Sequence, residues 1–292
     1  MQANAELVLD ARATLGECPV WDARREKLYW VDILERKLHE FDVSTGRDRA
    51  FNTGQFIGSL AIRKKGGLVL GLHHGFGFFN LRTQKIQPIC EPEALRPDNR
   101  FNDGKCDPAG RFWAGSMDCD ARPRQGSLFC LDTNHNVRRV LRNLSIPNGI
   151  TWSQDGEIMF FIDSAFPIVW AFDYDPASGR ISRRRPVIRI SSREGVPDGM
   201  TIDAEGMLWV ALWGGGCITQ WNPKNGNLLR KIPLPVSLVS SCTFGGPGLR
   251  DLYVTSARMS LKPSALSREP LAGGIFRLQP GVSGIPDYFF GG

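Results

Sequence analysis

No hydrophobic run in this sequence of 292 residues approaches the length of a transmembrane helix. The longest nearly apolar stretch, Ala165 to Phe172, has eight residues, whereas a membrane span needs about 20. The first fifteen residues contain Glu6, Asp10 and Arg12 and lack the apolar block of a secretory signal. We therefore expect a soluble, cytoplasmic protein with no membrane partner.

The sequence also lacks the spacings of a thiolate metal site or a paired disulfide framework. It has seven cysteines, an odd number, and no Cys-x-x-Cys pair, so a reducing compartment is indicated. The formal net charge is +6, but the basic residues form short, scattered clusters. A nucleic-acid partner would rest on net charge alone and would show steep salt dependence. We expect no nucleic acid partner.

Sustained helical periodicity is almost absent as well. Short β-rich runs bounded by Gly, Asp and Pro recur along the whole length instead. Hydrophobic residues make up 42% of the chain and charged residues 23%, enough apolar material for a packed core and too little charge for a disordered chain. The sequence therefore predicts an all-β fold.

The β-rich runs form six similar units, each with a polar or small first residue and most with a Gly-containing turn between the first two strands. The unit starts are separated by 41, 44, 46, 50 and 42 residues, a period typical of a four-stranded propeller blade. We predict a single six-bladed β-propeller domain over residues 1–292. The N-terminal run 6–12 should add the outer strand of the last blade and so close the ring. The units begin at Glu17, Gly58, Asn102, Asn148, Asp198 and Ser240.

Equivalent positions of the innermost strands should form a ring around the central channel. Four of the six first positions are acids or amides: Glu17, Asn102, Asn148 and Asp198. Each of the Asn-Gly and Asp-Gly pairs, taken singly, also fits a plain turn, whereas Glu17 is a poor turn residue. Two carboxylates with amide oxygens, and no convergent His or thiolate, suit Ca²⁺, Mg²⁺ or Mn²⁺ better than a structural zinc. Few protein ligands would leave an open site for metal-assisted hydrolysis.

Several blocks of the sequence resemble one protein family along essentially the whole chain. The blocks are GECPVWD (16–22), RFNDGKCDPAGRFWAGSM (100–117), PNGITWS (147–153), PDGMTIDAEGMLWVA (197–211) and AGGIFRL (272–278). They are similar to the conserved blocks of the regucalcin (senescence marker protein) and gluconolactonase family. The resemblance implies a six-bladed β-propeller that opens lactone rings of sugar acids with one divalent cation.

The resemblance also implies roles for individual residues. The family's metal ligands fall on Glu17, Asn148 and Asp198, and Asp198 would also be the proton acceptor or donor. The substrate contacts fall on Arg100, Asn102 and Asp120. Close relatives often carry Glu at the last position, so Asp118 is an alternative to Asp120. Asp103, beside the site, either orients the ligands or belongs to an Asp-Gly turn.

The expected function is the metal-dependent hydrolysis of an aldonolactone, such as an arabinono-, xylono-, glucono- or galactonolactone. The expected cofactor is one divalent ion, Ca²⁺ before Mg²⁺, Mn²⁺ or Zn²⁺, and the expected partner is the small sugar lactone. The alternative is a non-enzymatic, calcium-binding regulatory propeller. Saturable lactone turnover separates the two hypotheses.

Overall fold

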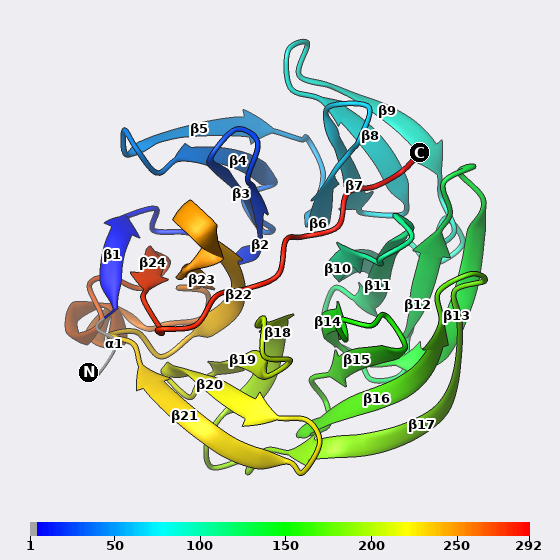
Figure 1. Cartoon of the computed structure of the whole chain (residues 1–292). Helices are drawn as coiled ribbons and strands as arrows, with labels where there is room; N and C mark the ends of the chain where they lie inside the picture. The colour runs from blue at the N-terminus through cyan, green and yellow to red at the C-terminus, as the bar shows by residue number, and fades with distance from the viewer. Residues whose placement is uncertain (1–4) are drawn as a thin grey trace.

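The computed structural model describes residues 5–292 and arranges them as six four-stranded antiparallel sheets around a central axis (Figure 1). The prediction of a six-bladed propeller is confirmed. Each sheet is one blade, and its first-listed strand below is the innermost. Blade 1 contains β2 (Gly16–Asp22), β3 (Lys27–Asp32), β4 (Lys37–Asp42) and β5 (Arg47–Asn52). Blade 2 contains β6 (Ile57–Ile62), β7 (Leu68–Leu72), β8 (Phe76–Asn80) and β9 (Lys85–Cys90).

The next three blades repeat this order of strands. Blade 3 contains β10 (Asn99–Cys106), β11 (Phe112–Asp118), β12 (Gly126–Leu131) and β13 (Val137–Leu144). Blade 4 contains β14 (Pro147–Trp152), β15 (Ile158–Asp163), β16 (Ile168–Asp175) and β17 (Arg180–Arg189). Blade 5 contains β18 (Val196–Ile202), β19 (Leu208–Trp213), β20 (Cys217–Asn222) and β21 (Asn227–Pro233).

Blade 6 joins the two ends of the chain. It contains β22 (Val239–Gly245), β23 (Asp251–Ser256), β24 (Ile275–Leu278) and, as its outer strand, β1 (Glu6–Leu9). Because β1 pairs antiparallel with β24, the predicted closure by the N-terminal strand is confirmed. A short helix, α1 (Pro263–Arg268), and a 3-10 turn at Pro247–Leu249 lie in this blade's connections. Among residues 5–292, no helix has the length and apolar character needed to cross a membrane.

Hydrophobic side chains fill the six interfaces between neighbouring blades. Each of the six buried clusters draws residues from two adjacent blades, including the pair formed by blades 6 and 1. Trp30, Trp113, Trp152 and Trp209 are among the largest fully buried side chains. A blade therefore has little core of its own, and the hydrophobic stabilisation depends on the ring being complete.

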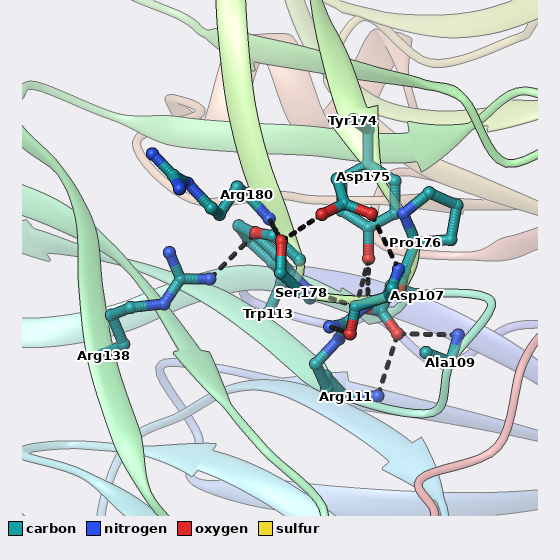
Figure 2. Close-up of polar contacts among 12 residues, drawn as sticks. Asp107, Ala109, Arg111, Trp113, Arg138, Tyr174, Asp175, Pro176, Ser178 and Arg180 are labelled. Atoms are coloured by element: carbon teal, nitrogen blue, oxygen red, sulfur yellow. Dashed lines mark hydrogen bonds and ion pairs between the residues drawn. The ribbon is translucent and has the colours of Figure 1, made fainter.

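A buried Asp–Trp contact ties the turn after the inner strand to the blade in two of the units. In blade 3, Asp107 accepts hydrogen bonds from the backbone N–H of Ala109, from the indole of Trp113 and from the hydroxyl of Tyr174 in blade 4, at 2.9, 2.8 and 2.5 Å (Figure 2). Arg111 pairs with the same carboxylate at 2.6 Å and donates to the carbonyl of Pro176. The network therefore locks blade 3 to blade 4.

Blade 5 repeats the first part of this arrangement. Asp203 accepts hydrogen bonds from the backbone N–H of Glu205 and the indole of Trp209, at 2.9 and 2.8 Å. Both units share the pattern Asp-x-x-Gly-x-Leu/Phe-Trp. The glycines at the turns adopt the left-handed region, with φ of 81° at Gly110 and 79° at Gly206, as the predicted hairpins require.

The C-terminal segment, residues 283–292, crosses the ring at the ends where the inner strands finish (Figure 1). Ser283 accepts a hydrogen bond from Ala204 of blade 5, and Phe290 bonds with Ile62 and Lys64 of blade 2. The Phe290 side chain is fully buried and packs against Phe78 at 6.0 Å between ring centroids. The segment thus covers one end of the channel and connects blades that are distant in sequence.

We expect Phe290→Ala to destabilise the protein by about 3–5 kcal/mol, because it leaves a cavity among buried aromatic side chains. The measurement is the free energy of unfolding in a urea titration. Phe166→Ala is the matched control, since that ring is 41% exposed, and it should change stability by less than about 0.5 kcal/mol. Equal effects of the two substitutions would show that the C-terminal segment does not contribute to the folded ring.

Candidate active site

The polar first residues of the units lie on β-bulges of the inner strands. Pairing with the second strand shifts register between Glu17 and Val20 in β2, and corresponding shifts interrupt β6, β10, β14, β18 and β22. A bulge bends its strand and re-aims the side chains beside it. All six shifts occur near the same ends of the inner strands, opposite the C-terminal segment, and the channel is therefore polar at that end.

Glycine permits the inner strands to approach each other at these bulges. A Cβ on Gly199 would lie 2.1 Å from the Oγ of Ser241 in the next blade, and one on Gly149 would lie 2.8 Å from the backbone oxygen of Asp198. Such contacts are too short for any side chain. The glycine after Asn148 and the glycine after Asp198 are thus required for close approach of neighbouring strands.

A cavity of about 360 Å³ opens at this end of the channel, at the lower end of the range of about 300–1,000 Å³ for small-molecule sites. Its polar lining residues are Glu17, Arg100, Asn102, Asn148, Ser164 and Asp198. The structure therefore brings together all three predicted metal ligands and two of the three predicted substrate contacts. Their roles stay predictions.

A chain of hydrogen bonds connects most of these polar side chains. Arg100 Nη1 donates to Asn102 Oδ1 at 2.7 Å, and Asn102 Nδ2 donates to Asn148 Oδ1 at 2.8 Å. Asn148 Nδ2 then donates to Ser164 Oγ at 2.8 Å, and Ser164 Oγ donates to the carbonyl of Pro197 at 2.6 Å. The chain fixes the orientation of both amides, so that Asn148 Oδ1 is the oxygen turned toward Asn102.

Three acidic side chains lie close together here with few partners. Burial, and next the charge of Asp103, raise the pKa of Glu17 to about 8. Burial raises the pKa of Asp103 to about 6, although the Lys105 charge lowers it. Burial raises the pKa of Asp198 well above its ordinary value, and the charges of Glu17 and Asp103 raise it further. Asp198 Oδ1 is buried and accepts no hydrogen bond.

The residues present fit a divalent cation. From the site to the C-terminal segment, the channel holds two cationic side chains, Arg100 and Lys105, and four carboxylates, those of Glu17, Asp103, Asp198 and Asp287. When all four carboxylates are ionised, two negative charges are unbalanced, and one divalent ion would neutralise them. Oxygen donors without His or thiolate favour a hard cation.

An amide completes the donor set. Within residues 5–292, no group of three or more His, Cys, Asp or Glu side chains is placed to hold a metal ion. A cation at this site therefore needs the Asn148 amide beside Glu17 and Asp198. The orphaned Asp198 Oδ1 is the atom whose missing partner points most directly to such an ion.

Asp120 lies apart from the other predicted residues. It is exposed and does not line the cavity, whereas its neighbours Cys119 and Ala121 do. Asp118, the alternative, is buried but pairs with Arg122 at 2.7 Å and accepts hydrogen bonds from the backbone of the same turn. The structure thus gives Asp118 a turn-stabilising environment and leaves Asp120 at the rim.

Asp103 and Ser164 have positions that the sequence only partly indicated. Asp103 lies within β10, at the bulge between Phe101 and Gly104, and accepts a hydrogen bond from the backbone N–H of Gly104 at 2.7 Å. The alternative of an Asp-Gly turn is therefore wrong. The Asp103 charge acts on Glu17 and Asp198, and its role in orienting the ligands stays a prediction. Ser164 lies outside the inner strands, in the turn after β15. No motif marks it, and only the spatial pairing with Asn148 reveals it.

Lys105 connects the site to the far end of the channel. Burial lowers the pKa of Lys105, but the charges of Asp287 and Asp103 raise it more. The Lys105 ammonium lies 3.5 Å from Asp287 of the C-terminal segment. That segment therefore supplies a counter-charge beneath the candidate site.

A family match and two similar proteins point to the same group of proteins. The family described as the SMP-30/Gluconolactonase/LRE-like region matches residues 15–258. The chain is 41% identical to regucalcin of Gallus gallus over 293 aligned positions, which cover 98% of each chain. It is 36% identical to YvrE of Bacillus subtilis (strain 168), a protein named as a candidate sugar lactone lactonase, over 99% of each chain.

Solved structures agree with the sequence matches. A calcium-binding protein named regucalcin, from Agrobacterium tumefaciens, superimposes with a TM-score of 0.94 at 28% identity, covering 99% of this chain and 97% of the other. A luciferin-regenerating enzyme superimposes with a TM-score of 0.93 at 32% identity, over 99% of each chain. Both likenesses extend over the complete ring.

The raised pKa of Glu17 gives a stability prediction for the metal-free protein. Its ordinary value is 4.5 and its folded value about 8, so stability that is present below pH 4.5 is lost as the pH rises toward 8. In EDTA, wild type should lose about 2 kcal/mol more than Glu17→Gln between pH 6 and pH 8. Urea titrations at the two pH values measure this difference.

The exposed Glu26 supplies the control for that comparison. Glu26→Gln should follow the wild-type pH dependence, because its carboxylate lies in water in both states. If Glu17→Gln also follows the wild type, the carboxylate cluster does not strain the folded protein.

Proposed function

Because the chain belongs to the SMP-30/gluconolactonase/LRE-like family, we propose that it hydrolyses the lactone of a sugar acid to the open-chain acid. The proposal rests on the buried, unpartnered oxygen of Asp198 at the cavity that also contains Glu17 and Asn148. The named activity of the Bacillus relative supports it. The expected substrates are aldonolactones such as arabinono-, xylono-, glucono- or galactonolactone.

Glu17, Asn148 and Asp198 would hold one divalent cation, with Ca²⁺ as the first choice among hard cations. When bound, the ion acts as a Lewis acid toward the lactone carbonyl. The description of the Agrobacterium relative as a calcium-binding protein supports this choice. The charge balance of the channel supports a divalent ion independently.

The side chains of this protein would carry the proton transfers. Asp198 takes a proton from a water molecule as the water oxygen forms a bond with the acyl carbon. The bond between the acyl carbon and the ring oxygen then breaks, and the proton passes to that oxygen to make a hydroxyl group. Arg100 donates hydrogen bonds to oxygens of the bound ring. Ser164 and Asn102 hold the Asn148 amide in place.

A calcium-binding regulator without turnover is the competing function, and the name of the Agrobacterium relative favours it. Arg100 argues for an enzyme. Its guanidinium is buried beside the acidic cluster, where burial lowers its pKa, and a simple ion store gains nothing from a cation next to the ion. Tight calcium binding without saturable lactone turnover would favour the regulator.

Asp198→Asn should lower kcat for aldonolactone hydrolysis by about 10²–10⁴-fold, the usual contribution of a positioned general acid or base. A pH-stat assay with added divalent ion, corrected for spontaneous ring opening, measures the loss. Asp155→Asn, in an exposed turn at the other end of blade 4, is the control and should keep wild-type kcat. Full turnover by Asp198→Asn would exclude this mechanism.

Ser164→Ala should weaken divalent-ion binding by about 10–100-fold, because the Asn148 amide loses the hydroxyl that orients it. Isothermal titration calorimetry with CaCl₂ measures the affinity directly, without reference to activity. Ser164→Thr keeps a hydroxyl and should restore most of the binding, and Ser192→Ala, an exposed serine, should have no effect. Unchanged affinity in Ser164→Ala would mean that the hydrogen bond does not position the amide.

A further inference from the structure

Trp213 lines the entrance of the cavity from the end of β19. Its partner on the neighbouring strand is Val196, two residues before Asp198. Its ring packs against the hydrophobic cluster that contains Leu15, two residues before Glu17. Val196 and Leu15 line the same cavity. The indole therefore borders the cavity together with two of the three predicted metal ligands.

The surroundings of Trp213 hold it in place. Its backbone forms a β-bridge with Leu238, in the connection that leads to blade 6. The three glycines that follow, 214–216, make a tight turn, and a Cβ on Gly215 would lie 2.1 Å from the carbonyl oxygen of Glu194. The turn therefore has no room for a side chain at that position. Because the backbone is fixed and the ring packs against formed core, a ligand can contact the indole at little ordering cost.

The Trp213 indole has an unused hydrogen-bond donor. Elsewhere in the ring of blades, the indoles of Trp113 and Trp209 donate to buried carboxylates of their own blades, each at 2.8 Å. Trp213 is only partly buried, and its Nε1 has no acceptor among residues 5–292. An indole combines a nonpolar body with one polar N–H group, which can serve a ligand where no protein acceptor is present.

Most other donors at the cavity are engaged within the protein. Asn102 donates to Asn148 and to the carbonyl of Pro147, which uses both of its side-chain N–H groups. Asn148 donates to Ser164 and to Asp198. Ser164 in turn donates to a backbone carbonyl at 2.6 Å. The amide and hydroxyl hydrogens of the floor are therefore not free for substrate.

Arg100 and Trp213 remain as side chains of the cavity with free N–H groups. Arg100 spends Nη1 on two bonds within blade 3, which leaves Nε and Nη2. The carboxylates of Glu17 and Asp198 can accept hydroxyl hydrogens but donate nothing when ionised. A hydroxyl oxygen that loses its water here needs a donor in exchange, because an unpaired polar group is costly. A sugar lactone with several hydroxyl groups thus needs more donors than Arg100 alone supplies.

We propose that Trp213 is a substrate-binding residue whose indole N–H donates a hydrogen bond to a hydroxyl oxygen of the sugar lactone. The inference rests on the lactonase function proposed above and specifies how the same site recognises a hydroxylated ring. The lactone carbonyl faces the floor, so Trp213 contacts a part of the substrate away from the bond that breaks. The nonpolar face of the indole covers carbon atoms of the ring. Trp213 transfers no proton.

Trp213→Phe and Trp213→Tyr form a matched pair, since they differ by one hydroxyl group. Both keep an aromatic face, but only the Tyr variant keeps a donor. A contact made equally with bound substrate and transition state contributes to KM and leaves kcat unchanged. For glucono-δ-lactone with saturating CaCl₂, Trp213→Phe should raise KM by about 5–30-fold at constant kcat, the loss expected for one hydrogen bond. Trp213→Tyr should bring KM back to within about threefold of the wild type.

δ-Valerolactone separates hydroxyl recognition from packing, because it has the same ring size and no hydroxyl group. Its kcat/KM should change by less than about threefold in Trp213→Phe. Trp170→Phe is the control, since Trp170 lies on β16 and does not line the cavity. It should keep the wild-type values for both lactones. Equal losses for the two lactones in Trp213→Phe would show that the indole only packs, and the inference would be wrong.

Binding of lactams provides a readout that does not depend on turnover. In D-glucono-δ-lactam a ring N–H replaces the ring oxygen, and 2-piperidone is the corresponding ring without hydroxyl groups. Calorimetric affinity for the glucono-lactam should fall in Trp213→Phe by the same factor as KM rises, and should recover in Trp213→Tyr. Unchanged affinity in Trp213→Phe would overturn the inference. The affinity for 2-piperidone should be nearly the same in all three proteins.

The outcomes separate this inference from the proposed function. If wild type hydrolyses glucono-δ-lactone and Trp213→Phe keeps its KM, the inference fails and the lactonase proposal stands. If wild type hydrolyses no lactone but binds the glucono-lactam in a manner that depends on Trp213, the lactonase proposal fails and the binding role stands. If wild type neither hydrolyses the lactone nor binds the lactam, both fail.

Discussion

The burial of three neighbouring carboxylates that cannot move apart is the constraint on which the rest of this structure depends. Glu17, Asp103 and Asp198 lie on the inner strands of blades 1, 3 and 5, yet the closed ring holds them at one end of a narrow channel. Burial deprives them of water, and hydrogen bonds from the backbone of Cys18 and Gly104 offset only part of the loss. The fold therefore stores electrostatic strain where an ion can relieve it.

The strain is tolerated because the ring has no weak interface at which to open. Each hydrophobic cluster spans two blades, so separating any pair exposes core to water. The pairing of β1 with β24 completes the last blade. The C-terminal segment adds contacts across the other end of the channel and places Asp287 against Lys105. The stabilising free energy of the blade interfaces therefore compensates for the unfavourable burial of carboxylates at the centre.

The repeat made much of this predictable from sequence. A period of 41 to 50 residues predicted six blades, and the first residue of each unit predicted which side chains converge. The convergence of Glu17, Asn148 and Asp198 follows from symmetry, since equivalent positions on equivalent strands meet at the axis. Contacts that break the repeat could not be inferred in this way.

Three features of the structure break the repeat and could not be predicted from it. Ser164 binds Asn148 from a turn, across a sequence separation that no motif encodes. The C-terminal segment is not part of any unit, and only the folded ring shows that it forms hydrogen bonds with five blades. Asp120 was assigned by resemblance to a position in a loop, and the backbone of that loop places it at the rim. The conformation of a loop is set by its local contacts more than by the symmetry of the blades.

The same distinction explains how a propeller can separate chemistry from substrate selection. The floor of the cavity consists of inner-strand residues, whose positions are set by pairing within the blade and by close packing of neighbouring strands at Gly149 and Gly199. The nonpolar residues that line the rest of the cavity, such as Phe56, Val196 and Trp213, lie in connections and at strand ends. A change at Val196, which is 42% exposed, would alter the lining of the cavity without moving the bulges. The ion-binding geometry is therefore constrained by the whole ring, whereas the entrance is constrained only by its own loops.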